Sequence, residues 1–123
     1  MIVESYLSVI KRESALCPGV VYRVERMSFG RRIELMKAIR EVAVKIDFLD
    51  ATNDADRMAD SVLSAEVDRL YLQWGLKEVD GLLIDGVPAT PESLVLAGPE
   101  ELSREALAFV ISECGLNEAE KKT

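Results

Sequence analysis

One run of apolar residues constrains the fold of this chain more than any other feature of its sequence. Five apolar side chains recur at intervals of four, three, four and three residues: Leu35, Ile39, Val42, Ile46 and Leu49. This spacing places them along one side of an α-helix. Ser28 precedes the run and has the short polar side chain that favours a helix start. We therefore expect a long helix over about residues 29–50.

A second apolar run predicts a partner for this helix. The polar segment 51–53 separates the two runs, and Thr52 and Asn53 in it are both suited to cap a helix. Apolar residues then recur at similar spacing: Met58, Val62, Leu63, Val67, Leu70, Tyr71 and Trp74. Two amphipathic helices joined by a short loop form an antiparallel hairpin. We expect this pair, at about 29–50 and 54–74, to form the core of the domain.

The segment before the first helix predicts a pair of β-strands. Residues 5–10 and 19–27 are rich in β-branched and aromatic side chains, and a Cys-Pro-Gly sequence at 17–19 supplies a turn between them. Apolar residues share one face of the second run: Val20, Tyr22 and Val24. This alternation is typical of a half-buried strand. Residues 5–10 would also suit one face of a helix.

Turn and helix signals follow in the last third of the chain. The Asp-Gly pair at 85–86 lies between short apolar runs and fits a tight type I′ turn, which predicts a small β-hairpin. Thr90 followed by Pro91 is typical of a helix start, and this short helix should end near Gly98. A further helix then carries an apolar side: Leu102, Ala106, Phe109 and Val110. Gly115 is suited to end it.

These elements together predict an α+β fold in one domain. The predicted order is N-terminal strands (1–27), a long antiparallel helix pair (28–75), a small β-hairpin with C-terminal helices (76–116) and a frayed polar tail (117–123). The chain has 123 residues, of which 49% are hydrophobic and 30% charged. A chain of this size buries enough surface to fold without disulfides or metal ions.

The residue type most often used in catalytic and metal sites is absent from the sequence. The sequence has no His, so the commonest general base and metal ligand is missing. It also lacks the phosphate-binding motifs GxxxxGK[ST] and GxGxxG. The acidic stretch from Asp50 does not fit a calcium loop, because Ala55 stands where Gly is needed and Ser61 where a bidentate Glu is needed. We expect no enzymatic activity, no cofactor and no metal site.

Charge is distributed unevenly along the chain. Residues 1–45 carry nine basic and five acidic side chains, whereas residues 46–123 carry six and seventeen, for a net charge of -7. This asymmetry argues against a nucleic-acid binder and favours self-association or a charged protein partner, although solvated faces would give the same pattern. Glu4 stands where a signal peptide would carry its positive charges, so we expect no signal peptide, and no apolar run is long enough to span a membrane. We expect a soluble cytoplasmic protein in which Cys17 and Cys114 are reduced.

Six residues are candidates for partner binding: Arg26, Phe29, Arg31, Arg32, Tyr71 and Trp74. The first four form a basic cluster around an aromatic ring, which suits steering towards an acidic surface. The last two lie one helical turn apart, and side chains of these types dominate protein interfaces. The alternatives are a solvated basic face and a pair of aromatic residues that closes the core.

Four stretches in order resemble a known class of proteins: RMSFGRRIEL (26–35), YLQWGL (71–76), IDGVPATPESL (84–94) followed by GPEEL (98–102), and CGLNEAEKK (114–122). They are similar to small proteins of bacteriophage and prophage tail-gene clusters, most of all to tail assembly chaperones. The resemblance implies a non-enzymatic helper in the bacterial host cytoplasm that binds the apolar helices of a tape-measure or tail-tube protein. The alternative is a structural virion component, such as a tail or connector protein.

Overall fold

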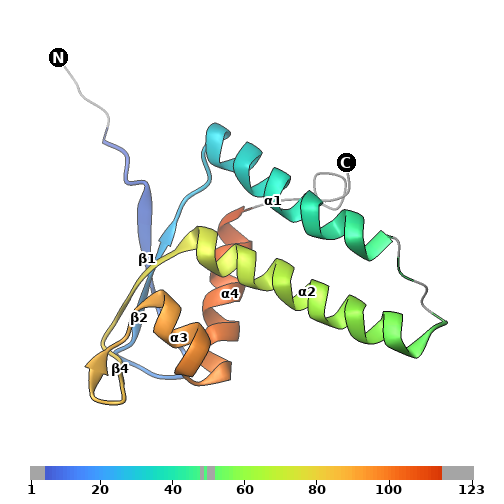
Figure 1. Cartoon of the computed structure of the whole chain (residues 1–123). Coiled ribbons are helices and arrows are strands. Elements are labelled where there is room, and N and C mark those ends of the chain that lie inside the picture. Colours follow the sequence, from blue (N-terminus) through green and yellow to red (C-terminus); the bar gives the residue numbers. More distant parts are fainter. Residues whose placement is uncertain (1–4, 48, 50–51, 115–123) are drawn as a thin grey trace.

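The computed structural model describes residues 5–47, 49 and 52–114, and it confirms the predicted α+β fold (Figure 1). Its elements follow in chain order: β1 (Val9–Glu13), β2 (Val21–Glu25), α1 (Phe29–Asp47), α2 (Asp54–Gly75), β3 (Leu76–Asp80), β4 (Leu83–Ile84), β5 (Val87–Pro88), α3 (Pro91–Ala97) and α4 (Glu100–Cys114). Strands β1, β2 and β3 form an antiparallel sheet with β2 in the centre. The helices lie on one side of this sheet (Figure 1).

The first strand lies later in the chain than predicted, over Val9–Glu13 rather than residues 5–10. The pairing of β1 with β2 explains the difference. Arg12 stands opposite the buried Tyr22 and so lies on the helical side of the sheet. There its Nη2 lies 3.2 Å from Oε1 of Glu113 on α4. The strand can therefore continue through the charged Arg12, because α4 supplies an ion-pair partner for it.

A third strand, β3, is absent from the sequence prediction. It follows α2 directly and pairs with β2. Its buried residues, Leu76 and Val79, lie three positions apart, which is the spacing of a helix rather than of a strand. A register shift on this pair, between Arg23 and Val24 of β2, accommodates that spacing.

The helix pair is antiparallel and is capped where the sequence indicated. Oγ of Ser28 accepts the N–H of Arg31 at 3.3 Å at the start of α1. Oδ1 of Asn53 accepts the N–H groups of Ala55 and Asp56 at 2.8 and 3.3 Å at the start of α2. The C-terminal half of α1 and the N-terminal half of α2 extend away from the sheet (Figure 1). The two helices therefore pack on each other along their length, but only one end of the pair reaches the sheet.

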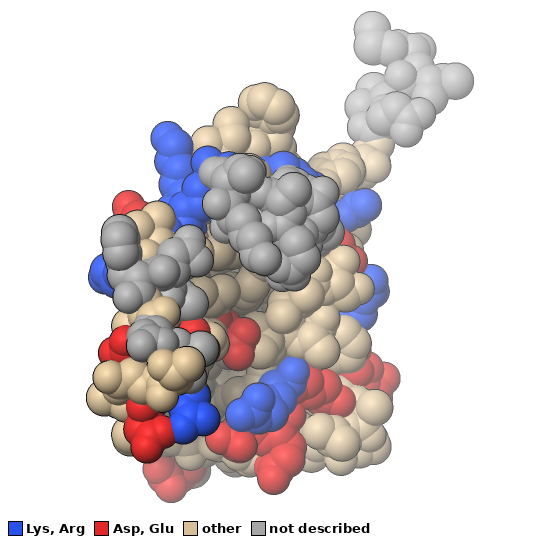
Figure 2. Space-filling model, turned by 90° about the vertical axis from the view of Figure 1, so that its right-hand side faces the viewer, with Lys and Arg blue, Asp and Glu red and all other residues tan. Residues whose placement is uncertain are grey.

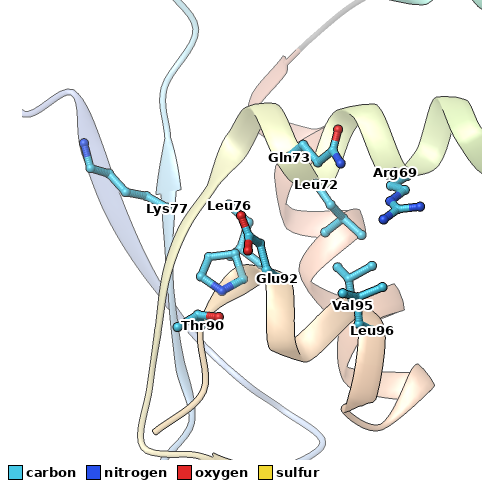
Figure 3. A pocket seen from close by; sticks show the side chains of 10 residues that line it. Arg69, Leu72, Gln73, Leu76, Lys77, Thr90, Glu92, Val95 and Leu96 are labelled. Atoms are coloured by element: carbon cyan, nitrogen blue, oxygen red, sulfur yellow. The ribbon is translucent and has the colours of Figure 1, made fainter.

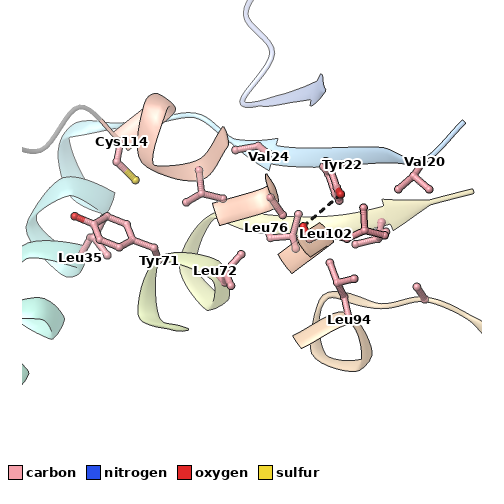
Figure 4. Packing of buried hydrophobic residues seen from close by; sticks show 14 of the residues in the cluster. Val20, Tyr22, Val24, Leu35, Tyr71, Leu72, Leu76, Leu94, Leu102 and Cys114 are labelled. Carbon is pink, nitrogen blue, oxygen red and sulfur yellow. Dashed lines mark hydrogen bonds between the residues drawn. The ribbon is translucent and has the colours of Figure 1, made fainter. Parts of the chain in front are cut away.

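The core is centred where the sheet, α4 and the near ends of α1 and α2 meet (Figure 4). The four helices, β2, β3 and two flanking positions contribute buried apolar residues to it: Val20, Tyr22, Val24, Leu35, Ile39, Tyr71, Leu72, Leu76, Val79, Ala89, Leu94, Leu102, Ala106, Val110 and Cys114. Tyr22 also donates a hydrogen bond of 3.3 Å to the carbonyl oxygen of Leu102 across this core. Val20, Tyr22 and Val24 are all buried on one side of the sheet, so the predicted alternation on the second strand is confirmed.

The prediction that the helix pair itself forms the core is wrong. Leu35 and Ile39 are buried, but Val42 and Leu49 of the same stripe are only partly buried. Val44, on the outer side of α1, is 53% exposed. The cause is geometric: the far halves of α1 and α2 extend beyond the sheet and α4, so each has only the other helix to pack against.

The last third of the chain follows its turn and cap signals. Asp85 and Gly86 have φ values of 52° and 79°, as a type I′ turn requires, and they connect β4 to β5. The hydroxyl oxygen of Thr90 accepts a hydrogen bond from the N–H of Ser93, and the hydroxyl oxygen of Ser93 accepts one from the N–H of Thr90. Pro91 is the first residue of α3. The predicted stop at Gly115 and the tail at 117–123 lie outside the described residues.

The two cysteines lie in different surroundings and are not joined by a disulfide. Cys17 is exposed in the connection between β1 and β2, whereas Cys114 is buried in the core at the end of α4.

Candidate binding groove

A hollow of about 780 Å³ opens between α2, β3 and α3 (Figure 3). Its lining includes Leu72, Leu76, Val95 and Leu96. A second hollow of about 300 Å³ continues along α2 towards α4 and shares Arg69, Leu72, Val95 and Leu96 with the first. We call the two hollows together the α2–α3 groove.

The floor of the α2–α3 groove is apolar. Leu72 projects from α2 towards Val95 of α3, with Leu96 beside it (Figure 3). Leu72 is buried and Val95 half-buried, whereas Leu96 is 73% exposed. An exposed leucine at the edge of an apolar floor adds favourable contact area for a ligand that covers it.

Charged side chains border this floor on both walls. Arg69 on α2 and Glu92 on α3 are exposed, and neither forms an ion pair with any residue that the structure describes. Lys77 lies at the rim, but its Nζ is 3.6 Å from Oε1 of Glu25. At the α4 end Arg104 and Glu100 neutralise each other at 3.4 Å. Arg69 and Glu92 are thus available to a ligand.

The groove has its shape because α3 is held firmly in place. The Thr90 cap fixes the start of α3, and Leu94 is fully buried beneath it. Ser103 on α4 donates a hydrogen bond of 3.2 Å to the carbonyl oxygen of Leu94. Because Leu94 faces the core, the next two residues of this short helix, Val95 and Leu96, face the groove.

The structure brings Arg31 and Trp74 together. The Arg31 guanidinium carbon lies 4.3 Å from the centre of the indole ring, and Nη2 of Arg31 donates a 2.6 Å hydrogen bond to the carbonyl oxygen of Trp74. Nη2 also lies 2.8 Å from Oε2 of Glu25. These contacts join α1, α2 and β2, so Arg31 has a structural role that the sequence did not indicate.

The other predicted partner-binding residues lie apart from the groove. Arg26 stacks on the ring of Tyr6, 4.8 Å from its centre, and Arg32 donates to the carbonyl oxygen of Cys114 at 3.5 Å. Phe29 is 85% exposed at the start of α1. Tyr71 is only 2% exposed, because it packs in the core, and so it presents almost no surface to a partner.

The sequence analysis missed the groove, although one signal pointed to it. Leu94, Val95 and Leu96 are consecutive apolar residues in a short helix. A short helix on the surface of a core buries only one side. At least one of these three side chains therefore had to face outwards, and the structure shows that two of them do.

A carboxylate with several hydrogen bonds lies on the opposite side of α4. Glu105 accepts hydrogen bonds from the hydroxyl groups of Ser14 and Tyr22 and from the N–H groups of Ala15 and Leu16. Burial alone would raise the pKa of Glu105, but these hydrogen bonds outweigh it and hold the pKa below its ordinary value. Burial, together with the nearby Glu105, raises the pKa of Tyr22 well above its ordinary value. This arrangement fastens the β1–β2 connection to α4 and leaves the carboxylate poorly suited to act as a base.

The described surface is mixed in charge. Asp and Glu gather over the lower part of the face in Figure 2, with individual Lys or Arg side chains among them. Within residues 5–47, 49 and 52–114, no group of His, Cys, Asp or Glu side chains is arranged to hold a metal ion. None of the helices described there combines the length and the apolar character needed to cross a membrane.

Comparison of the chain with protein-family models, curated proteins and solved structures gives no significant match.

Proposed function

We propose that this chain is a non-enzymatic phage tail morphogenesis protein, a tail assembly chaperone that binds an apolar helix of a tape-measure or tail-tube protein. The observation that carries the proposal is the α2–α3 groove, which has an apolar floor and charged walls. Grooves of this kind accept amphipathic helices, whose apolar side fills the floor while their polar side stays in water.

The distribution of exposed apolar residues also supports a binding role. Met58 and Val62 on α2 are 74% and 60% exposed, and Leu96 at the groove is 73% exposed. A chaperone needs apolar surface that remains open until its client arrives. Charged side chains around such surface keep the unbound protein from associating unspecifically.

The experiment is capture of the bound chain from cells that express this protein together with its neighbouring genes. An affinity-tagged copy is purified gently, and its partners are identified by mass spectrometry. Recovery of a long helical tail protein supports the proposal. Recovery of no tail protein contradicts it.

The presence of the chain in finished particles separates the two readings of the resemblance. An assembly chaperone is released before the particle is complete, so purified particles should contain none of it. A virion component would instead be found there in a fixed ratio to the tail-tube subunit. Quantitative mass spectrometry of purified particles distinguishes these outcomes.

A further inference from the structure

The outer side of α2 carries a stripe that continues from the α2–α3 groove. Its residues recur at intervals of four, three, four and three: Met58, Val62, Ala65, Arg69 and Leu72. Met58, Val62 and Ala65 are exposed, and Leu72 lies in the floor of the groove. Ala65 also lines the smaller hollow, so the exposed part of the stripe and the groove form one surface. We call this surface the α2 stripe.

Within the described residues the part of the α2 stripe from Met58 to Arg69 is exposed, whereas Leu72 at its end is buried and the opposite side of α2 packs on a neighbouring helix. Leu63, Val67 and Trp74 on that opposite side are partly buried, and α1 packs against α2 there. A regular alternation of four and three residues is the pattern by which one helix packs lengthwise on another. From Met58 to Leu72 the stripe spans about 21 Å at ~1.5 Å per residue, which is about four helical turns.

Arg69 defines the chemistry of the ligand that would cover the stripe. It stands between Ala65 and Leu72 and has no ion-pair partner among the described residues. Covering an arginine with an apolar helix leaves an uncompensated charge, and this costs several times the gain from a buried methyl group. A carboxylate in the facing position removes this cost and adds a charge-assisted hydrogen bond.

We infer that the α2 stripe receives an amphipathic helix of about four turns that carries a carboxylate opposite Arg69. This deepens the proposed function, on which it rests, by giving the chemistry of the client helix. The apolar residues of that helix lie over Met58, Val62 and Ala65 and reach the groove floor at Leu72, and its carboxylate lies at the position that faces Arg69.

A second copy of this chain fits the stripe less well. If two α2 helices paired about a two-fold axis at Ala65, each Arg69 would face the region of Ser61 on the other copy. Ser61 and the adjacent Val62 carry no negative charge, and Asp60, which precedes them, lies on the side of α2 opposite the stripe. Such a pairing would cover both arginines without a carboxylate, which disfavours it.

The test uses two labelled synthetic peptides of about 18 residues, each with leucine and alanine at the heptad contact positions. One peptide has Glu at the contact position that faces Arg69, and the other has Lys there. Fluorescence anisotropy gives the dissociation constant of each peptide for the parent chain and for Arg69→Glu. Because Arg69 is exposed, this variant should fold like the parent, which circular dichroism checks.

The parent should bind the Glu peptide at least roughly fivefold more tightly than the Lys peptide, and Arg69→Glu should reverse that order. Equal binding of both peptides, binding of neither, or an unchanged order in Arg69→Glu would overturn the inference. It is also overturned if light scattering shows a dimer of the parent that Val62→Asp dissociates, because the stripe would then be occupied by a second copy.

The inference and the proposed function can fail separately. If the chain captures a tail protein but binds the Glu and Lys peptides equally, the proposed function is supported and the role of Arg69 is contradicted. If Arg69→Glu reverses the order of the two peptide affinities but no tail protein is captured, the stripe binds helices and the assignment to tail assembly is contradicted.

Discussion

Gly75 at the end of α2 lies against Val110 of α4 so closely that no side chain fits between them. A Cβ atom placed on Gly75 would lie 2.5 Å from Cγ1 of Val110. Val110 is fully buried, and its β-branched side chain has little rotamer freedom with which to move aside. The contact sets how closely α2 approaches α4, and thereby the position of the α2–α3 groove.

Gly75→Ala should therefore destabilise the protein, by about 1–3 kcal/mol, because it overpacks the core. Chemical denaturation followed by circular dichroism measures the change. Gly30→Ala in α1 is the matched control, since a Cβ there meets nothing within 4 Å. That variant should be neutral or stabilised by up to about 1 kcal/mol, because alanine favours helix more than glycine does. Equal stability of the two variants would contradict the close contact at Gly75.

Glu105→Gln should lower the free energy of unfolding at neutral pH. It should also make that free energy depend less on pH in the acid range. The folded pKa of Glu105 is lowered from an ordinary value of 4.5. The carboxylate therefore contributes stability that is complete above that ordinary value and is lost as pH falls through the lower folded pKa. We expect a loss of about 1–3 kcal/mol at pH 7, the usual range for hydrogen bonds to a charged group.

The control for Glu105→Gln is Glu101→Gln, an exposed position on the same helix. Urea denaturation at a series of pH values from neutral to acid measures both. The free energy of unfolding of Glu101→Gln should equal that of the parent at every pH. If the free energy of unfolding of Glu105→Gln also equals that of the parent at every pH, the hydrogen bonds to the β1–β2 connection do not contribute to stability.

Substitutions along α1 should separate its near half from its far half. Ile39 is 2% exposed, Val42 is half-buried and Val44 is 53% exposed. Ile39→Asp should unfold the domain, because an unpaired buried charge costs several kcal/mol against a total of roughly 5–15 kcal/mol. Val42→Asp should cost less, and Val44→Asp should melt close to the parent. Equal melting temperatures for Ile39→Asp and Val44→Asp would place the core elsewhere.

Arg31→Ala should lower stability by about 1–2 kcal/mol, since it removes the contacts of the guanidinium with Trp74 and with Glu25. The sequence alone suggested a surface that steers a partner, with a solvated basic face as the alternative. Arg57→Ala is the control, because among the described residues Arg57 pairs only with the exposed Asp54, three positions earlier in the chain. Thermal melting of both compares them. If both variants lower the melting temperature by a similar small amount, Arg31 is a solvated surface charge without a structural role.

The elements that local chemistry determines could be predicted from the sequence. The caps at Ser28, Asn53 and Thr90 and the turn at 85–86 depend on residues within a few positions of each other, so the structure has them where the sequence indicated. Strand β3 was missed, because its pairing with β2 depends on residues more than 50 positions away and its buried residues have helical spacing.

The proposed binding surface was predictable only in part. The apolar spacing on α2 is visible in the sequence, but which of its two sides faces α1 depends on tertiary packing. The groove requires Leu72 and Val95 to lie on facing elements, and nothing local determines that arrangement. Residue type makes Tyr71 and Trp74 candidates for an interface, but Tyr71 is buried in the core.

The most direct test of the α2–α3 groove as the binding surface compares two leucines of similar exposure. Leu96, 73% exposed, lines the groove, whereas Leu83, 66% exposed, lies on β4 outside it. The affinity of the Glu-containing helical peptide is measured for Leu96→Asp and for Leu83→Asp. Leu96→Asp should weaken binding at least about tenfold, equivalent to about 1.4 kcal/mol, while Leu83→Asp binds as the parent does. Equal affinity of the two variants would contradict the assignment of the groove as the binding surface.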